Sequence, residues 1–99
     1  MVSIAKRLTI LIMIKPYHYK DHLMVAKQPY IKWFKTIEDA KLYCSLLVID
    51  GFDDWRLPNG ADSKTIHKMA NKLNINVNYH YNSDIHAKWP QKAIPVRNR

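Results

Sequence analysis

The feature that most constrains the fold is a pair of apolar stripes in the middle of the chain. In the first stripe, apolar side chains recur at spacings of three and four, at Ile37, Ala40, Cys44 and Leu47, with Tyr43 beside them. The second stripe has the same spacing, at Ile66, Met69, Ala70 and Leu73. Such spacing places side chains on one face of an α-helix. We therefore expect two amphipathic helices, each of which must bury its stripe against another element.

The residues that flank these stripes predict where the helices begin and end. The Thr36 hydroxyl can accept a hydrogen bond from the amide of Asp39 and so cap the first helix. We expect Asp50-Gly51 to stop this helix, because glycine readily adopts the left-handed conformation of a C-terminal cap. The second helix should start near Asp62 or Ser63, because both residue types are good N-caps.

The segments on both sides of the two helices predict β-strands. Four of them precede the first helix, at residues 8–14, 17–19, 23–26 and 30–34, and three follow the second, at residues 75–81, 85–89 and 93–96. Residues 75–81 alternate strictly, so Ile75, Val77, Tyr79 and Tyr81 should share one face. Pro95 restricts the last segment to an edge or a bulge. We predict an α+β fold in which two α-helices pack on one antiparallel β-sheet.

The length of 99 residues indicates a single domain over residues 1–99. Residues 8–14 are too few to span a bilayer as a helix, which needs about 20 residues. Lys6-Arg7 before this run is typical of a signal peptide, but Lys15-Pro16-Tyr17 stands where a small-residue cleavage site should lie. Residues 1–12 are an extension that is either flexible or, if translation starts at Met13, not part of the protein. The short apolar run leads us to expect no membrane segment. The single cysteine excludes an intramolecular disulfide, so we expect a cytoplasmic protein.

A specific motif follows the first helix. Residues 51–59 read Gly-Phe-Asp-Asp-Trp-Arg-Leu-Pro-Asn, and they come after Ala40, Tyr43-Cys44 and Leu47. Together they resemble the Ala…Tyr-Cys…Leu…Gly-Tyr-x-Asp-Trp-Arg-Leu-Pro-Thr/Asn segment of the Lcl C-terminal-like domains. Two further segments are similar to parts of that family. Ile94-Pro95-Val96-Arg97 is similar to its closing Val-Arg strand, and residues 79–83 are similar to its Tyr/Phe-Trp-Ser-Ser/Thr segment.

The resemblance implies a reduced form of the fold that C-type lectins share with the formylglycine-generating enzyme. It also implies carbohydrate binding, but only for some members, and the family includes small stand-alone phage proteins. The chain departs from the family in two places. Residues 60–63 stand where members usually have Glu-Leu, and 99 residues leave no room for the longer ligand-bearing loops. The enzyme's cysteine pair is also absent, so its activity does not carry over.

The motif itself is best interpreted as structural, through Asp53, Asp54, Trp55, Arg56, Leu57 and Pro58. We expect Trp55 and Leu57 to fill the core and Pro58 to fix the direction of the chain. Arg56 can pair with Asp53 or Asp54 and so hold the loop. The alternative is that Asp53, Asp54 or Arg56 contacts a ligand.

The residue types that carry metal or catalytic chemistry form no known pattern. Four oxygen-bearing side chains could bind calcium, although their spacing is not that of a dedicated calcium loop: Asp53, Asp54, Asn59 and Asp62. The chain has five histidines, His18, His22, His67, His80 and His86. Their spacing is not that of a zinc site. We expect His18 and His80 to face solvent, and Cys44 to be a buried, protonated thiol. No catalytic residue, cofactor or metal site is predicted.

Charge gives the strongest indication of function. The net charge is +8, and six of the eight acidic residues lie between Glu38 and Asp62, so basic segments flank an acidic middle. Such polarity suits an acidic partner, and the alternative is that the lysines form an ordinary solvated surface that keeps the protein soluble. The candidate partner-binding cations are Lys64, Lys68 and Lys72, which recur every four residues on one helix face, together with Lys88, Lys92, Arg97 and Arg99. Four aromatic residues are candidates for stacking or protein contact, or else for the core: Tyr17, Tyr19, Tyr30 and Trp33.

Three classes of function compete. The first is a small non-enzymatic binding protein that docks a basic surface on an acidic protein or on nucleic acid, for example a phage-encoded modulator of a complex in the host cytoplasm. The second is a reduced lectin-like module that binds carbohydrate. The third is a metal-dependent enzyme. We favour the first, because no export signal, disulfide or ligand loop supports the second and no acid–base pair supports the third.

Overall fold

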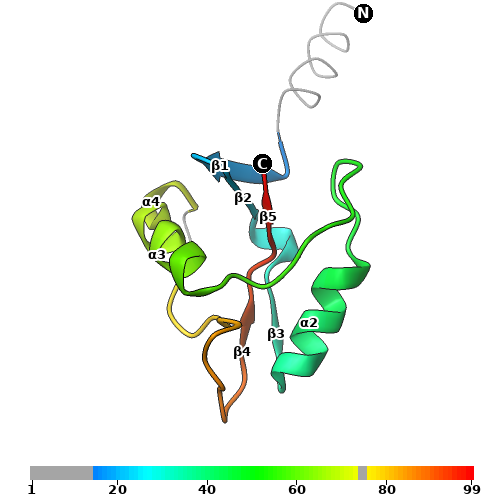
Figure 1. Cartoon of the computed structure of the whole chain (residues 1–99), viewed down its shortest axis with the longest axis vertical. Coiled ribbons are helices and arrows are strands. Elements are labelled where there is room, and N and C mark those ends of the chain that lie inside the picture. Colours follow the sequence, from blue (N-terminus) through cyan, green and yellow to red (C-terminus); the bar gives the residue numbers. More distant parts are fainter. Residues whose placement is uncertain (1–14, 74–75) are drawn as a thin grey trace, which may run out of the picture.

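The computed structural model describes residues 15–73 and 76–99, and within them the fold is mixed α+β, as predicted (Figure 1). The elements in chain order are β1 (Tyr17–Lys20), β2 (Leu23–Ala26), the 3₁₀ turn η1 (Gln28–Tyr30), β3 (Lys32–Phe34), α2 (Ile37–Leu46), α3 (Gly60–Lys68), α4 (Ala70–Leu73), β4 (Gln91–Ala93) and β5 (Val96–Asn98). The strand predicted at residues 8–14 and the alternative start at Met13 lie outside the described residues. Among the helices of the described part, none has both the length and the apolar character needed to cross a membrane.

The strands form two antiparallel sheets where one was predicted. One sheet has the order β1-β2-β5, and the other pairs β3 with β4. Residues Ile94 and Pro95 divide the predicted strand 93–96 and carry the chain from one sheet to the other. Proline has no amide hydrogen to donate to a ladder, which explains the break at this point. The Pro95 carbonyl still accepts a hydrogen bond from the Ala26 amide at 2.9 Å.

Each sheet is covered by helices that carry one of the two predicted stripes. In Figure 1, α3 and α4 lie on one side of the strands and α2 on the other, and residues 52–59 cross between them. One core cluster joins α3 and α4 to the three-stranded sheet, through Leu23, Val25, Ile66, Met69, Leu73, Val77, Ile94 and Val96. A second cluster joins α2 to β4 and the motif, through Ile37, Ala40, Cys44, Leu57, Tyr81 and Ala93. Both apolar stripes are therefore confirmed as core-facing.

The helix ends follow the sequence predictions only in part. The cap on α2 is confirmed, because the Thr36 hydroxyl accepts a hydrogen bond from the Asp39 amide at 3.2 Å. The end predicted at Asp50-Gly51 is wrong: α2 ends at Leu46, and both residues have positive φ in the turn that follows, 55° and 81°. That turn is closed by reciprocal hydrogen bonds between the backbones of Ile49 and Phe52.

The predicted start of the second helix is also wrong by a few residues. The helix α3 begins at Gly60, and Asn59 is its N-cap instead of Asp62 or Ser63. Asn59 and Asp62 form a reciprocal capping box, in which each side chain accepts a hydrogen bond from the other residue's backbone amide. Asp62 thus occupies the third helical position, where an acidic side chain can reach back to the cap.

Strands were predicted at residues 75–81 and 85–89, but none forms in the parts that the structure describes, residues 76–81 and 85–89. Tyr79 interrupts the first alternation, since it is 64% exposed and has a φ of 61°. Asparagine side chains explain the loss, because Asn76 accepts a hydrogen bond from the Asn78 amide and Asn82 accepts one from the Asp84 amide. These local turns compete with strand pairing for the same backbone donors. Residues 85–89 also lie in a loop, where Ile85 and Trp89 are exposed.

Candidate ligand-binding face

One face of the three-stranded sheet packs on the loop that follows α2, and there it combines aromatic rings with arginines. Tyr19 lies opposite Met24, which lies opposite Arg97, so these three side chains form one row across the sheet. The neighbouring row on the other face belongs to the core beneath α3 and α4. We call the first side the aromatic–arginine face, and define it by the residues that line a hollow of about 440 Å³: Tyr17, Tyr19, Met24, Phe52, Arg97 and Arg99.

The aromatic rings of this face form a connected group. The Tyr17 ring centroid lies 6.2 Å from that of Tyr19 and 6.3 Å from that of Phe52, with an edge-on geometry in the second pair. Trp55 is 6.5 Å from Tyr17 and only 3% exposed, and its indole N–H donates to the Phe52 carbonyl at 3.0 Å. Trp55 thus supports the group from the core, as the motif predicted. Tyr19 is half exposed, so it offers a ring surface to solvent.

Each arginine of the face lies over one of these rings. The Arg97 guanidinium is 3.9 Å from the Phe52 ring centroid, and that of Arg99 is 4.0 Å from the Tyr19 centroid. Both distances are within the range of cation–π attraction. Arg99 also donates to the carbonyl of Asp21 at 3.3 Å. The sheet therefore presents planar cations that are already stacked on aromatic side chains.

A carboxylate neutralises one of the two arginines. Arg97 donates through Nε to Asp54 Oδ1 at 2.5 Å and through Nη2 to Oδ2 at 3.1 Å. This two-point hydrogen bond lowers the pKa of Asp54, so the carboxylate is ionised at neutral pH. Within residues 15–73 and 76–99 the ion pairs are this one and Arg56–Asp62, and neither involves Arg99.

Arg56 does not pair with Asp53 or Asp54, which corrects the prediction for the motif. Its backbone exchanges two hydrogen bonds of 2.8 Å with Val96, and this places Arg56 beside the first turn of α3. There its Nη1 donates to Asp62 at 2.6 Å, and Nη2 donates to the Asn98 side chain at 2.8 Å. Leu57 is buried as predicted and Pro58 is buried next to it, whereas Asp53 is exposed.

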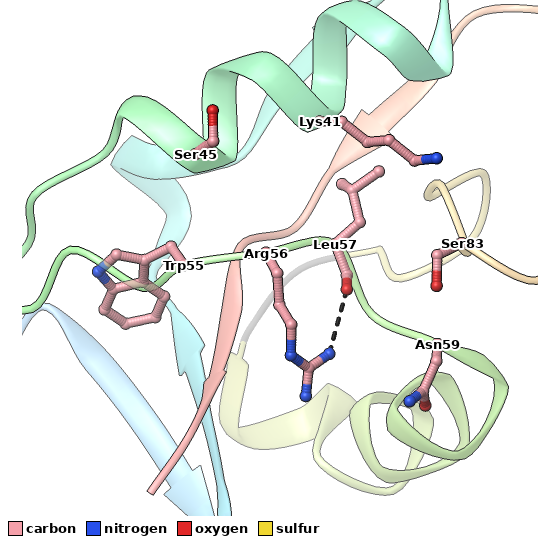
Figure 2. A pocket seen from close by; sticks show the side chains of 7 residues that line it. All are labelled: Lys41, Ser45, Trp55, Arg56, Leu57, Asn59 and Ser83. Carbon is pink, nitrogen blue, oxygen red and sulfur yellow. Dashed lines mark hydrogen bonds between the residues drawn. The ribbon is translucent and has the colours of Figure 1, made fainter.

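A second hollow, of about 400 Å³, lies between α2 and the motif (Figure 2). Its lining residues are Lys41, Ser45, Trp55, Arg56, Leu57, Asn59 and Ser83. Figure 2 shows Arg56 pointing toward α3, where Asp62 binds it, while Lys41 extends from α2 past Leu57. The polar groups of this hollow do not converge on one point, so we give more weight to the aromatic–arginine face.

The seven predicted partner-binding cations occupy four separate places. Lys64 and Lys68 are exposed on α3 and Lys72 on α4, and the sheet separates these helices from Arg97 and Arg99. Lys88 is exposed in the loop before β4. Lys92 is partly buried: its ammonium group donates to the Asn76 carbonyl and lies 5.8 Å from the Trp33 ring, and burial lowers its pKa.

The remaining aromatic candidates lie elsewhere. Trp33 is on β3 and 58% exposed. The Tyr30 carbonyl accepts a hydrogen bond from the Tyr43 hydroxyl at 2.7 Å, which connects η1 to α2. Phe52 belongs to the face but was not proposed from the sequence. The available signal was its place in the motif, directly before the paired Asp53 and Asp54.

The solvent-facing position predicted for His18 and His80 is wrong, whereas the burial predicted for Cys44 is confirmed. His80 does not face solvent, because its ring is held between Ser63 and Val77, and His18 is partly buried. Burial lowers the pKa of both imidazoles, and Lys27 and Lys72 also lower that of His18. Cys44 is buried as predicted, and burial raises its pKa to about 12.

The structure does not bring the four candidate calcium ligands together, because three of them take part in two unrelated contacts. Asn59 and Asp62 cap α3, whereas Asp54 binds Arg97. In the described part of the chain, no three His, Cys, Asp or Glu side chains lie close enough together to hold a metal ion.

Comparisons with protein-family models, with curated proteins and with solved structures found no match.

Proposed function

We propose that this protein binds single-stranded nucleic acid on the aromatic–arginine face. The observation that carries the proposal is the exposed Tyr19 ring with the Arg99 guanidinium stacked 4.0 Å from its centroid, on an edge strand of the sheet. Proteins that bind single strands without strong sequence preference combine aromatic stacking surfaces with cationic groups that follow the backbone. An aromatic–arginine pair supplies both, because the ring stacks on a base and the guanidinium binds a phosphate.

The charge of the chain and of the surrounding turn supports a polyanionic partner. The net charge is +8 with a calculated isoelectric point near 9.7. Lys20 and His22 are exposed at the β1–β2 turn, and Arg99 bonds to the backbone of that turn at Asp21. A nucleic-acid strand that stacks on Tyr19 would therefore meet the Lys20 ammonium group and the His22 imidazole at the end of the hairpin. Nucleic acid suits this arrangement better than an acidic protein, because carboxylates alone would leave the exposed ring without a stacking partner.

The expectations of a reduced C-type-lectin-like fold and of a cytoplasmic protein are part of this proposal. The first is supported by the burial of Trp55, Leu57 and Pro58 in the motif. The second is supported by the single buried cysteine.

Fluorescence anisotropy with a labelled oligothymidylate, titrated at several salt concentrations, tests the proposal. Tyr19→Ala should weaken binding roughly 5- to 150-fold, which corresponds to the loss of one stacked base at about 1–3 kcal/mol. Arg99→Ala should weaken binding and reduce the slope of log affinity against log salt by about 0.7, the value for one phosphate contact to a single strand. The control is the triple variant Lys64→Glu, Lys68→Glu, Lys72→Glu, which changes charge on the opposite side of the sheet.

Different results point to different surfaces. If the triple variant loses binding and Tyr19→Ala does not, the ligand lies on α3 and α4, and this result overturns the proposal. Heparin is a polyanion without bases. An affinity for heparin equal to that for the oligothymidylate would show that binding depends on charge and not on stacking. Binding of a neutral glycan that is insensitive to salt would favour the lectin-like alternative instead.

A further inference from the structure

A cavity of about 240 Å³ lies between α3 and the loop that follows residue 76, away from the aromatic–arginine face. Its lining residues are Ser63, His67, Val77, Asn78, Tyr79, His80, Asn82 and Ile85. Ser63 and His80 meet at its wall, where Ser63 Oγ lies 3.0 Å from His80 Nε2. The other ring nitrogen, Nδ1, lies 2.6 Å from the Val77 carbonyl oxygen. A hydroxyl, an imidazole and a fixed acceptor thus form one continuous chain.

The partners of His80 determine where its proton lies. A carbonyl oxygen can only accept a hydrogen bond, so the neutral imidazole carries its hydrogen on Nδ1 and donates to Val77. Nε2 then has a free lone pair and accepts the hydroxyl hydrogen of Ser63. This is the arrangement of a serine nucleophile with a general base, in which a third group orients the base. Burial lowers the pKa of His80, which keeps the imidazole neutral and able to accept a proton at pH 7.

The surroundings of the pair are those of a reactive site. Ser63 is on the first turns of α3 and only 9% exposed, so a rigid helix holds its hydroxyl. Tyr79, directly before His80, has a φ of 61°, a conformation that costs energy for a non-glycine residue and recurs at functional sites. The side chains of Asn78 and Asn82 line the same cavity, and amide N–H groups of this kind can stabilise a developing oxyanion. The His67 ring lies 5.7 Å from that of His80.

We propose that Ser63 and His80 form a nucleophile–base pair that transfers the acyl group of a small ester. Ser63 Oγ attacks the ester carbonyl carbon, and His80 Nε2 takes the hydroxyl proton. The bond from that carbon to the alcohol oxygen then breaks, and His80 returns the proton to the leaving alcohol. A water molecule, activated in the same way by His80, hydrolyses the acyl–serine bond and restores the hydroxyl. Val77, Tyr79 and Ile85 provide the apolar wall for the acyl chain. This activity is separate from nucleic-acid binding and departs from the expectation of a non-enzymatic chain.

The test uses a fluorophosphonate probe, which reacts covalently with activated serines, on the full chain. Peptide mass spectrometry should locate the adduct on Ser63. The decisive variant is His80→Asn, because the asparagine amide nitrogen can replace Nδ1 as the donor to Val77 but supplies no base. His80→Asn should abolish the adduct and lower the hydrolysis of p-nitrophenyl acetate by at least about 100-fold, the usual contribution of a general base. The matched control is Ser83→Ala, which removes an exposed serine outside this cavity and should change neither result.

Two outcomes overturn the proposal. The first is a folded parent protein, verified by its cooperative thermal transition, that gains no adduct on Ser63. This result needs no variant, so it holds even where His80→Asn does not fold. The second is an adduct or a hydrolysis rate that persists in a folded His80→Asn variant, which would show that Ser63 and His80 only connect the loop to α3.

Discussion

The carboxylate of Asp62 binds the guanidinium of Arg56, with 2.6 Å between Oδ2 and Nη1. The same oxygen accepts the Asn59 amide at 3.0 Å, so one buried carboxylate caps α3 and holds the motif. Arg56 in turn bonds to the backbone of Val96 at the start of β5. The pair therefore connects the helix, the motif and the three-stranded sheet.

Asp62→Ala should destabilise the fold by about 2–3 kcal/mol. The substitution removes an ionised acceptor of two hydrogen bonds and leaves Arg56 without its carboxylate partner. Urea unfolding measures the loss. Asp53→Ala is the matched control, because Asp53 is exposed and should change stability by no more than about 0.5 kcal/mol. Similar losses in both variants would contradict a special role for Asp62.

Trp55→Ala should cost about 3–5 kcal/mol, the range for truncation of a buried tryptophan. Trp55 is 3% exposed and packs beneath the rings of the aromatic–arginine face. Trp33→Ala provides the comparison, because Trp33 is 58% exposed. Thermal melting followed by circular dichroism distinguishes the two, and a Trp55→Ala variant that melts like the parent would place Trp55 outside the core.

Asp54→Asn should tighten the binding of oligothymidylate. The substitution removes a negative charge that now neutralises Arg97, and the gain should be on the order of 1 kcal/mol or less, because the site is exposed to water. Anisotropy titration at low salt measures the change. The effect should shrink as salt rises, because screening weakens interactions between exposed charges. Weaker binding would mean that Asp54 holds Arg97 in the orientation that the ligand requires.

Stability should fall on mild acidification. Burial lowers the pKa of His80 below the ordinary 6.5, so the unfolded chain binds the proton more readily than the folded one. The contribution of His80 is fully present above about pH 6.5 and is lost as pH falls toward the lowered pKa. One such group adds a slope of at most about 1.4 kcal/mol per pH unit. Urea unfolding between pH 7.5 and 5 measures it, and His80→Asn should flatten the curve, while His18 retains a smaller dependence of the same sign.

Cys44 should resist alkylation in the folded protein. Burial raises its pKa to about 12, so almost no thiolate exists at pH 8. Intact mass after iodoacetamide treatment should show the unmodified chain, and addition of denaturant should produce a single adduct. Rapid labelling without denaturant would mean that α2 opens readily from the β3–β4 sheet.

The sequence predicted the parts of the fold that depend on local periodicity. The stripes through Ile37 and Ile66, the cap at Thr36 and the burial of Trp55 each follow from spacing or from residue type over a few positions. The strands 17–20 and 23–26 were also located closely, because short apolar or aromatic segments between polar turns have few other interpretations.

The errors arose from two sources, local turns and contacts distant in sequence. The pattern from Val77 to Tyr81 reads as a strand, but asparagine turns and the bond from His80 to Ser63 hold it as a loop. Arg56 was assigned to the nearest acids, yet its backbone pairing with Val96 brings it to Asp62. The candidate face was predicted in pieces, as Tyr17, Tyr19, Arg97 and Arg99, because only sheet register shows that β1 and β5 flank one strand.

That register has a consequence for how the face is made. Val25 pairs with Val96, so the sheet joins segments near opposite ends of the described chain. Closing so long a loop costs conformational entropy, and this cost slows the formation of the sheet. A nascent polypeptide that ends before Val96 contains Tyr17 and Tyr19 but lacks Arg97 and Arg99. The ability to hold a ligand on this sheet should thus arise late, after α2, α3 and α4 have been synthesised.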